Sequence, residues 1–188
     1  MQAEIERPAK ALFFEHALLA DGWASNVRLV LKSGLIGAIE RDCLTQADDE
    51  RHRCALPAMS NLHSHAFQRA MAGAAERSGG SPDSFWTWRE AMYASLAHMG
   101  PDELRAVASL AYVEMLESGF SRVGEFHYLH HDLNGAPFSN IAEMSAAIVA
   151  AAMDSGIGLT LLPVLYSHAG FGAVPPNAAQ GRFILDVD

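Results

Sequence analysis

The segment His63-Ser64-His65 carries the side chains of this sequence that are best suited to metal chemistry. It follows an apolar run at residues 56–59, which predicts an extended strand. Two histidines at positions i and i+2 of a strand point to the same face, so both imidazoles can reach one ion. Neutral imidazole is a common ligand of zinc and related metals. The pair therefore indicates a metal site, with two solvated histidines at a strand edge as the alternative.

Four stretches of the sequence, taken together, carry a family resemblance that extends to about Phe183. They are residues 56–73, which contain the two histidines, 83–93 (DSFWTWREAMY), 124–132 (GEFHYLHHD) and 161–172 (LLPVLYSHAGFG). The combination resembles the formimidoylglutamate deiminases of the amidohydrolase superfamily. The resemblance implies a hydrolase that converts N-formimino-L-glutamate to N-formyl-L-glutamate and ammonia in histidine degradation. It also implies one zinc ion as cofactor, with His63 and His65 as metal ligands, although the spacing alone also accepts iron, nickel or manganese.

The resemblance assigns a substrate contact to Arg89, in the Trp-Thr-Trp-Arg stretch. The implied substrate is a small anion with two carboxylates, and a guanidinium offers a planar, bidentate fork for a carboxylate. The alternative interpretation is a surface ion pair of Arg89 with Glu90 or Asp83.

Gln68 and Tyr128 are the other two substrate-binding residues that the resemblance implies. Gln68 comes three residues after His65, past the predicted strand, in a loop where barrel enzymes place their chemistry. Tyr128 directly follows the strand predicted over 122–127, so its hydroxyl can reach a substrate carboxylate. The alternatives are a solvent-facing or helix-capping glutamine and a tyrosine that only packs.

Five further residues are weaker candidates. The histidines at 127, 130 and 131 form a cluster that could be interpreted as a second metal site. We favour a core or supporting histidine at His127 and loop caps at His130 and His131. Glu125 and His168 lie near predicted strand ends, where they could shape the site.

Composition excludes several classes of function. The net charge is −9, with 13 basic and 22 acidic residues, and lysine occurs only at positions 10 and 32. Because no basic cluster occurs, we expect neither a nucleic-acid partner nor a membrane partner. The start of the sequence has no apolar signal-peptide core, and two cysteines without a Cys-x-x-Cys motif fit a reducing compartment. We therefore expect a cytoplasmic protein.

The elements that must position these residues follow an α/β pattern. Residues 11–56 are β-rich, with strands expected at 27–31 and 35–39 and a turn at Ser33-Gly34. A helix is expected over 101–118 and a strand over 122–127. Asn140 and Glu143 resemble a capping box for a helix that ends near Ser155-Gly156. The apolar run 159–166 is typical of a strand buried on both faces.

The resemblance specifies a partial TIM (β/α)8 barrel of the amidohydrolase type, preceded by a small β-sheet domain. The expected domains are residues 1–56 and 57–188. Roughly 130 residues follow the β-rich domain, enough for about three of the eight βα units, so we interpret the chain as the N-terminal part of a longer enzyme. The resemblance then places a further His, an Asp and the acid/base groups beyond residue 188. It predicts an inactive chain when isolated, and a homodimer for the intact enzyme.

Two other interpretations stay open. One is another deaminase of the superfamily, acting on a nucleobase or a related heterocycle. Arg89 with Tyr128 argues against it, because a neutral ring needs no carboxylate clamp. The other is an inactive truncated fragment that binds only a metal or a partner.

Overall fold

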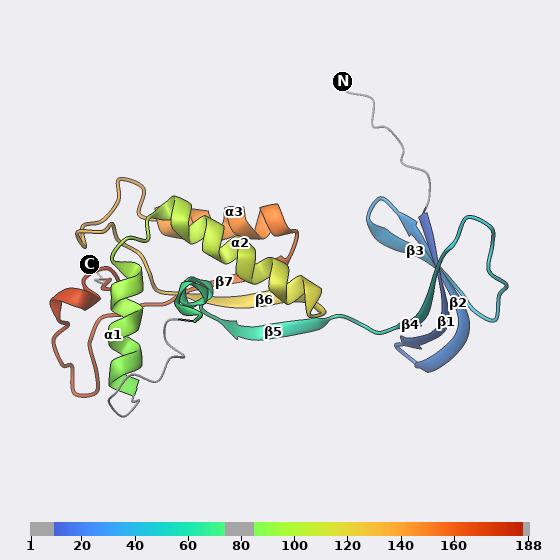
Figure 1. Cartoon of the computed structure of the whole chain (residues 1–188), viewed down its shortest axis with the longest axis horizontal. Coiled ribbons are helices and arrows are strands. Elements are labelled where there is room, and N and C mark those ends of the chain that lie inside the picture. The colour runs from blue at the N-terminus through green and yellow to red at the C-terminus, as the bar shows by residue number, and fades with distance from the viewer. Residues whose placement is uncertain (1–9, 74–84, 186–188) are drawn as a thin grey trace, which may run out of the picture. The chain divides into compact units, whose positions relative to one another are not determined.

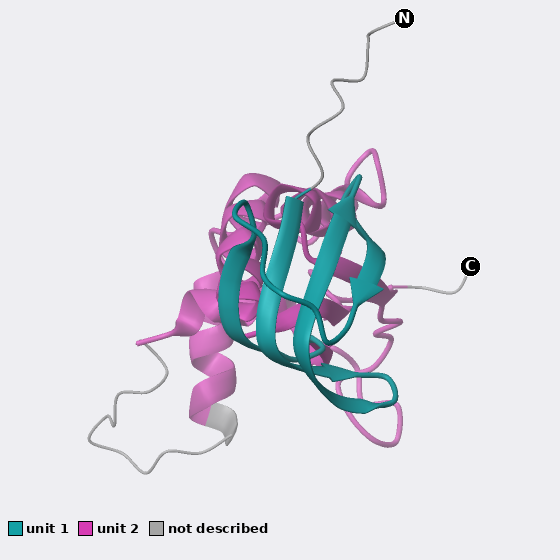
Figure 2. Cartoon of the chain, turned by 90° about the vertical axis from the view of Figure 1, so that its right-hand side faces the viewer, with its two compact units in different colours: residues 1–58 teal, residues 59–188 magenta. Residues whose placement is uncertain are grey.

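The computed structural model of the chain describes residues 10–73 and 85–185. The chain divides into two compact units, residues 1–58 and 59–188, which Figure 2 shows in different colours. Each unit has its own sheet and its own hydrophobic core. A mixed α/β class and a small N-terminal β-sheet domain are therefore confirmed.

Unit 1 is a four-stranded sheet in the order β3-β2-β1-β4. Its strands are β1 (Lys10–Leu19), β2 (Gly22–Lys32), β3 (Leu35–Glu40) and β4 (Glu50–Ala55). Strand β1 pairs antiparallel with β2 and parallel with β4. Side chains of β1 and β2 form a small apolar core around Phe14, Ala17 and Val27.

The turn between β2 and β3 confirms the expectation for Ser33-Gly34. Both residues have positive φ, 51° and 77°, as a two-residue turn of type I′ demands.

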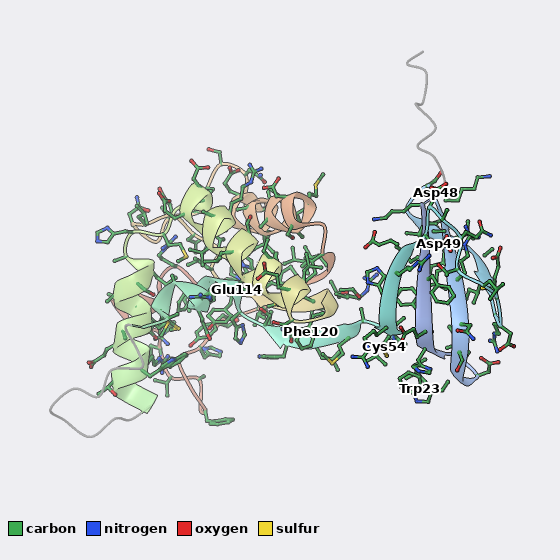
Figure 3. The ribbon with its side chains drawn as sticks, turned by 45° about the vertical axis from the view of Figure 1, so that its right-hand side comes forward. Trp23, Asp48, Asp49, Cys54, Glu114 and Phe120 are labelled. Atoms are coloured by element: carbon green, nitrogen blue, oxygen red, sulfur yellow. The ribbon has the colours of Figure 1, made fainter. Side chains whose placement is uncertain are left out.

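In unit 1, Arg28 donates from Nε to the buried Asp49 carboxylate at 2.8 Å, and Asp49 is labelled in Figure 3. The hydrogen bond from the Gln46 amide lowers the pKa of Asp49, and the ion pair with Arg28 adds to this effect.

Unit 2 contains a three-stranded parallel sheet in the order β5-β6-β7. The strands are β5 (Met59–Ser64), β6 (Phe120–His127) and β7 (Gly158–Pro163). The helices α2 (Pro101–Glu117) and α3 (Glu143–Ser155) lie over one face of this sheet (Figure 1). The short helices η1 (Ala66–Met71) and η2 (Ala178–Gln180) and the helix α1 (Phe85–Leu96) complete the unit. Figure 1 shows η1 and α1 at the end of the sheet toward which the strands run.

Helix α2 confirms the helix expected over 101–118. Pro101 occupies the first turn, where its missing N–H costs nothing, and Asp102 and Glu103 lie at the positive end of the helix dipole. Its buried residues recur at helical spacing and face the core of unit 2: Leu104, Ala108, Ala111 and Tyr112. Among the described helices, none is both long and apolar enough to cross a bilayer.

The capping box expected at Asn140 is wrong. Helix α3 begins at Glu143, and its N-cap is Ala142. The Asn140 Oδ1 accepts a hydrogen bond from the Ala142 amide at 3.1 Å, and its Nδ2 donates to Glu143 at 3.1 Å. The side chain therefore closes a turn ahead of the helix and does not cap it. The end of the helix is as expected, with Gly156 at φ 81°.

The strand expected over 159–166 is shorter, and it is not buried on both faces. Strand β7 ends at Pro163, although the Val164 amide still donates to the His127 carbonyl at 2.8 Å. Within the described residues β7 is an edge strand, with α3 packed nearby and Leu162 still 36% exposed. An apolar run alone could not distinguish a covered face from an open one.

Candidate functional site

The two histidines of the His-x-His segment point to one place, as their spacing predicts. His63 lies in β5 and His65 directly after it, and their Nε2 atoms are 3.0 Å apart. The Nδ1 of His65 lies 2.7 Å from the carbonyl oxygen of Phe126 in β6. Because a carbonyl only accepts, Nδ1 carries the proton and donates. The Nε2 lone pair of His65 is therefore left to face the shared point.

This geometry fits two ligands of one metal ion. Two nitrogens bound to a tetrahedral zinc at about 2.0–2.1 Å lie roughly 3.3 Å from each other, close to the separation of the Nε2 atoms. Burial lowers the pKa of His65, which favours the neutral, ligating ring. Among residues 10–73 and 85–185, no three His, Cys, Asp or Glu side chains are grouped to hold an ion. A complete metal site would therefore need ligands in addition to these two histidines.

A cavity of about 410 Å³ opens beside His65. It brings together the three residues expected to contact the substrate: Gln68 from η1, Arg89 from α1 and Tyr128 from the end of β6. Most of the remaining wall is apolar or aromatic, and its residues are Trp88, Met92, Tyr93, Tyr166, Ala169 and Phe183. A mostly apolar pocket with a few convergent polar groups is the usual form of a small-molecule site.

Gln68 and Tyr128 lie nearest to the histidine pair. The Gln68 Nε2 donates to the Tyr128 hydroxyl at 3.0 Å, and the Tyr128 ring packs edge-on against His65 with centroids 5.0 Å apart. Gln68 lies on the 3-10 helix η1 and not in an irregular loop, contrary to expectation. Arg69, the next residue, forms a bidentate pair with Glu114, which projects from α2 in Figure 3. This pair fixes η1 against α2. Burial raises the pKa of Tyr128, so its hydroxyl keeps its proton.

Arg89 is held inside the cavity by tyrosine hydroxyls. Its Nε donates to Tyr93 at 2.7 Å and its Nη2 to Tyr166 at 3.3 Å. The Tyr166 hydroxyl also accepts from Nε2 of Gln180, which is fully buried. Both of these acceptors are neutral hydroxyls. Of the two expected carboxylates, Asp83 lies outside the described residues.

Tyr93, Tyr166, Gln180 and Phe183 belong to the cavity or its support, and sequence reasoning missed them as site residues. Tyr93 could have been found, because it follows Arg89 by four residues on one helix, where side chains at i and i+4 are neighbours. Tyr166 and Gln180 come from segments far along the chain, and no local pattern links them to α1.

The three clustered histidines do not form a second metal site within the described residues. His127 is completely buried. His130 and His131 each point an Nε2 at a backbone carbonyl, that of Val164 at 3.0 Å and that of Ile184 at 2.6 Å. The rings therefore tie the loop after β6 to later segments, in agreement with the favoured role as loop caps.

The two weaker candidates differ in environment. Glu125 is completely buried, and its Oε1 accepts a hydrogen bond from the Ala66 amide at 2.6 Å. Burial raises the pKa of Glu125, and the Ala66 amide opposes that rise. His168 is exposed in the segment after β7, and the described lining of the cavity does not include it.

Burial of His127 predicts a loss of stability in mild acid. Burial lowers its pKa from 6.5 to about 4, so between these values the unfolded chain binds a proton that the folded chain does not. The stability gained from the neutral ring is complete above pH 6.5 and is lost as the pH falls toward 4. We expect His127→Leu to weaken the pH dependence of the unfolding free energy between pH 7 and 4.5 by about 2 kcal/mol. Urea unfolding at both pH values measures this, and His98→Leu, at an exposed site, is the control.

Comparison with known families matches a model to the first part of the chain. The model of the N-terminal domain of formimidoylglutamate deiminase HutF matches residues 9–53, which lie within unit 1.

Comparison with known proteins extends the likeness to unit 2. A formimidoylglutamate deiminase of Pseudomonas aeruginosa is 51% identical over 175 residues, which are 93% of this chain and 39% of the relative. An amidohydrolase of Brucella melitensis has a similar structure, with a TM-score of 0.85 and 54% identity over 94% of this chain and 40% of that one. An atrazine chlorohydrolase of Arthrobacter aurescens, solved with zinc, has a TM-score of 0.61 at 19% identity, covering 88% and 40%. At that identity the likeness concerns the fold alone. The chain spans about two-fifths of the length of each of these proteins.

Proposed function

We propose that this chain, which is similar over 93% of its length to a formimidoylglutamate deiminase, is the N-terminal part of an amidohydrolase of that kind. The intact enzyme would hydrolyse N-formimino-L-glutamate to N-formyl-L-glutamate and ammonia in histidine degradation. One observation carries the proposal. The cavity beside His65, which with His63 forms the metal-type pair, contains the guanidinium of Arg89, the amide of Gln68 and the hydroxyl of Tyr128. Ammonia release from this substrate tests it.

We propose that the sheet β5-β6-β7 is the first three strands of a TIM barrel. The strands are parallel and adjacent in chain order, and α2 and α3 follow β5 and β6 as crossover helices. His65, Gln68 and Tyr128 all follow the carboxyl end of their strands, where barrel enzymes place their sites. In this proposal the edges of β5 and β7 pair with strands that lie outside the present sequence.

His63 and His65 would hold a zinc ion through their Nε2 atoms. When bound there, zinc would lower the pKa of a water molecule toward about 7 and so supply hydroxide at neutral pH. The remaining ligands and the acid/base groups would come from the rest of the barrel. For this reason the 188-residue chain alone is expected to be inactive.

Arg89, Gln68 and Tyr128 would bind and orient the substrate. Arg89 presents a cation inside a mostly apolar cavity, where a charge-assisted bond to a carboxylate is strong. The Tyr128 hydroxyl accepts from Gln68 and donates to the Met92 sulfur at 4.0 Å, a long bond that it would exchange for one to a substrate oxygen. The aromatic wall of the cavity would exclude water from the methylene groups of the substrate.

The competing enzyme function is deamination of a nucleobase or a related heterocycle. A neutral ring gains little from Arg89, whereas a dicarboxylate needs it. Measuring ammonia release from N-formimino-L-glutamate, guanine, cytosine and adenosine in parallel separates the two.

We also propose a cytoplasmic homodimer. The two cysteines of unit 1 are both free thiols, which fits a reducing compartment.

Tyr166 is expected to influence binding more than turnover. In Tyr166→Phe, the Arg89 Nη2 and the Gln180 amide lose a shared acceptor, a change of about 1 kcal/mol. We expect KM for N-formimino-L-glutamate to rise roughly fivefold with little change in kcat. Steady-state kinetics measure both. In an Arg89→Met background the same change should have no further effect on KM, and an undiminished effect there would contradict the role.

A further inference from the structure

We infer that three consecutive residues of β6, Gly124, Glu125 and Phe126, form a template that sets the position of the metal-type histidines, with Glu125 as a positioning residue. The inference rests on the proposed metal site, but not on the identity of the substrate. Each of the three residues makes a different contact with the segment that carries His63 and His65.

The first contact accommodates a bulge. Asn61 pairs with Val123 and Ser64 with Glu125, so three steps along β5 match two steps along β6. One extra residue is therefore inserted between Asn61 and Ser64, next to His63. A bulge bends its strand and redirects the following side chains, and bulges are frequent beside active sites.

Gly124 lies opposite this bulge. A Cβ at position 124 would lie 3.0 Å from the carbonyl oxygen of Leu62, a backbone atom that cannot swing away. A side chain there would push the two strands apart at the residue before His63. Glycine is thus favoured by the close approach of the two backbones.

Glu125 holds the other end of the segment. Its Oε1 accepts the 2.6 Å hydrogen bond from the amide of Ala66, the residue after His65. The carboxyl group is fully buried beside Tyr112, where desolvation is costly, and an amide donor is what offsets such a cost. The bond fixes the backbone where β5 ends and η1 begins.

Phe126 completes the template through its carbonyl and its ring. The carbonyl accepts from Nδ1 of His65 at 2.7 Å, and the ring lies 4.3 Å from the His63 ring, centroid to centroid. One histidine is thus oriented by a hydrogen bond and the other by packing. Partners of this kind orient metal ligands and tune their basicity.

The test measures binding of Co²⁺, whose visible absorption reports ligand geometry, in a chain extended to the length of its relatives. Glu125→Met keeps the volume but removes the acceptor, and we expect Co²⁺ to bind 10- to 100-fold more weakly with altered absorption bands. Glu125→Gln keeps a carbonyl acceptor for the Ala66 amide, and we expect it to restore binding to within about threefold. Glu117→Met, at an exposed position of α2, is the matched control and should bind as the parent does.

Gly124→Ala provides a second route if Glu125→Met does not fold. We expect weaker Co²⁺ binding from Gly124→Ala and no change from Gly170→Ala, where an added Cβ meets no atom within 4 Å. Equal Co²⁺ affinity and spectra in the parent, Glu125→Met and Gly124→Ala would overturn the inference. Tight Co²⁺ binding without deimination would overturn the proposed substrate and leave the template standing. A parent that binds no Co²⁺ would overturn both the metal site and the template.

Discussion

Replacing His65 by alanine in the extended enzyme should lower kcat/KM for N-formimino-L-glutamate by a factor on the order of 10³ or more. The substitution removes one of two Nε2 atoms that lie 3.0 Å apart and face the same point. Without the ion, a water molecule at neutral pH is a poor nucleophile. Metal content by mass spectrometry should fall together with activity.

A matched substitution separates this effect from general damage. His98→Ala changes an exposed histidine and should keep both metal and activity. His63→Ala should behave like His65→Ala, because each ring supplies one nitrogen. Full activity of either variant without bound metal would contradict the assignment of the pair.

Replacing Arg89 by methionine should be the next most damaging change. We expect kcat/KM to fall roughly 30- to 1,000-fold, which corresponds to a loss of about 2–4 kcal/mol of transition-state stabilisation. The substitution keeps an unbranched apolar stem but leaves a substrate carboxylate in a mostly apolar cavity without its cation. Arg89→Lys should restore only part of the loss, because an ammonium cannot reproduce the planar fork that spans Tyr93 and Tyr166. Steady-state kinetics on both variants measure the loss.

The control for Arg89 is another arginine on a helix. Arg105 is exposed on α2 and pairs with Asp154 at 2.7 Å, so Arg105→Met should leave the kinetics unchanged. A substrate analogue that lacks carboxylates should be turned over equally by the parent and by Arg89→Met. A similar loss for both substrates would mean that Arg89 acts on the fold and not on the carboxylate.

The metal-type pair and the helix α2 could be predicted because their signals are local. The i, i+2 spacing of His63 and His65 in an extended segment predicts that both rings lie on one side of the chain. Helix α2 combines helical spacing of buried residues with Pro101 and acidic residues at its start. The turn at Ser33-Gly34 could also be predicted, because few pairs of residues adopt positive φ at two successive positions.

What the sequence did not predict depends on contacts between distant segments. Tyr166 reaches Arg89, and Gln180 reaches Tyr166, only because β7 and the chain after it return to α1. Asn140 has the residue type of a cap, but a competing turn takes its side chain. The roles of Gly124 and Glu125 depend on a one-residue bulge in the neighbouring strand, which periodicity cannot indicate.

The central claim is tested most directly by one measurement made on two proteins, the 188-residue chain and a version extended to the length of its relatives. The measurement is ammonia release from N-formimino-L-glutamate, with the bound metal quantified in the same samples. We expect the extended protein to bind about one zinc ion per chain and to release ammonia, and the shorter chain to do neither. An extended protein that binds zinc but ignores this substrate, or a shorter chain that turns it over, would contradict the account.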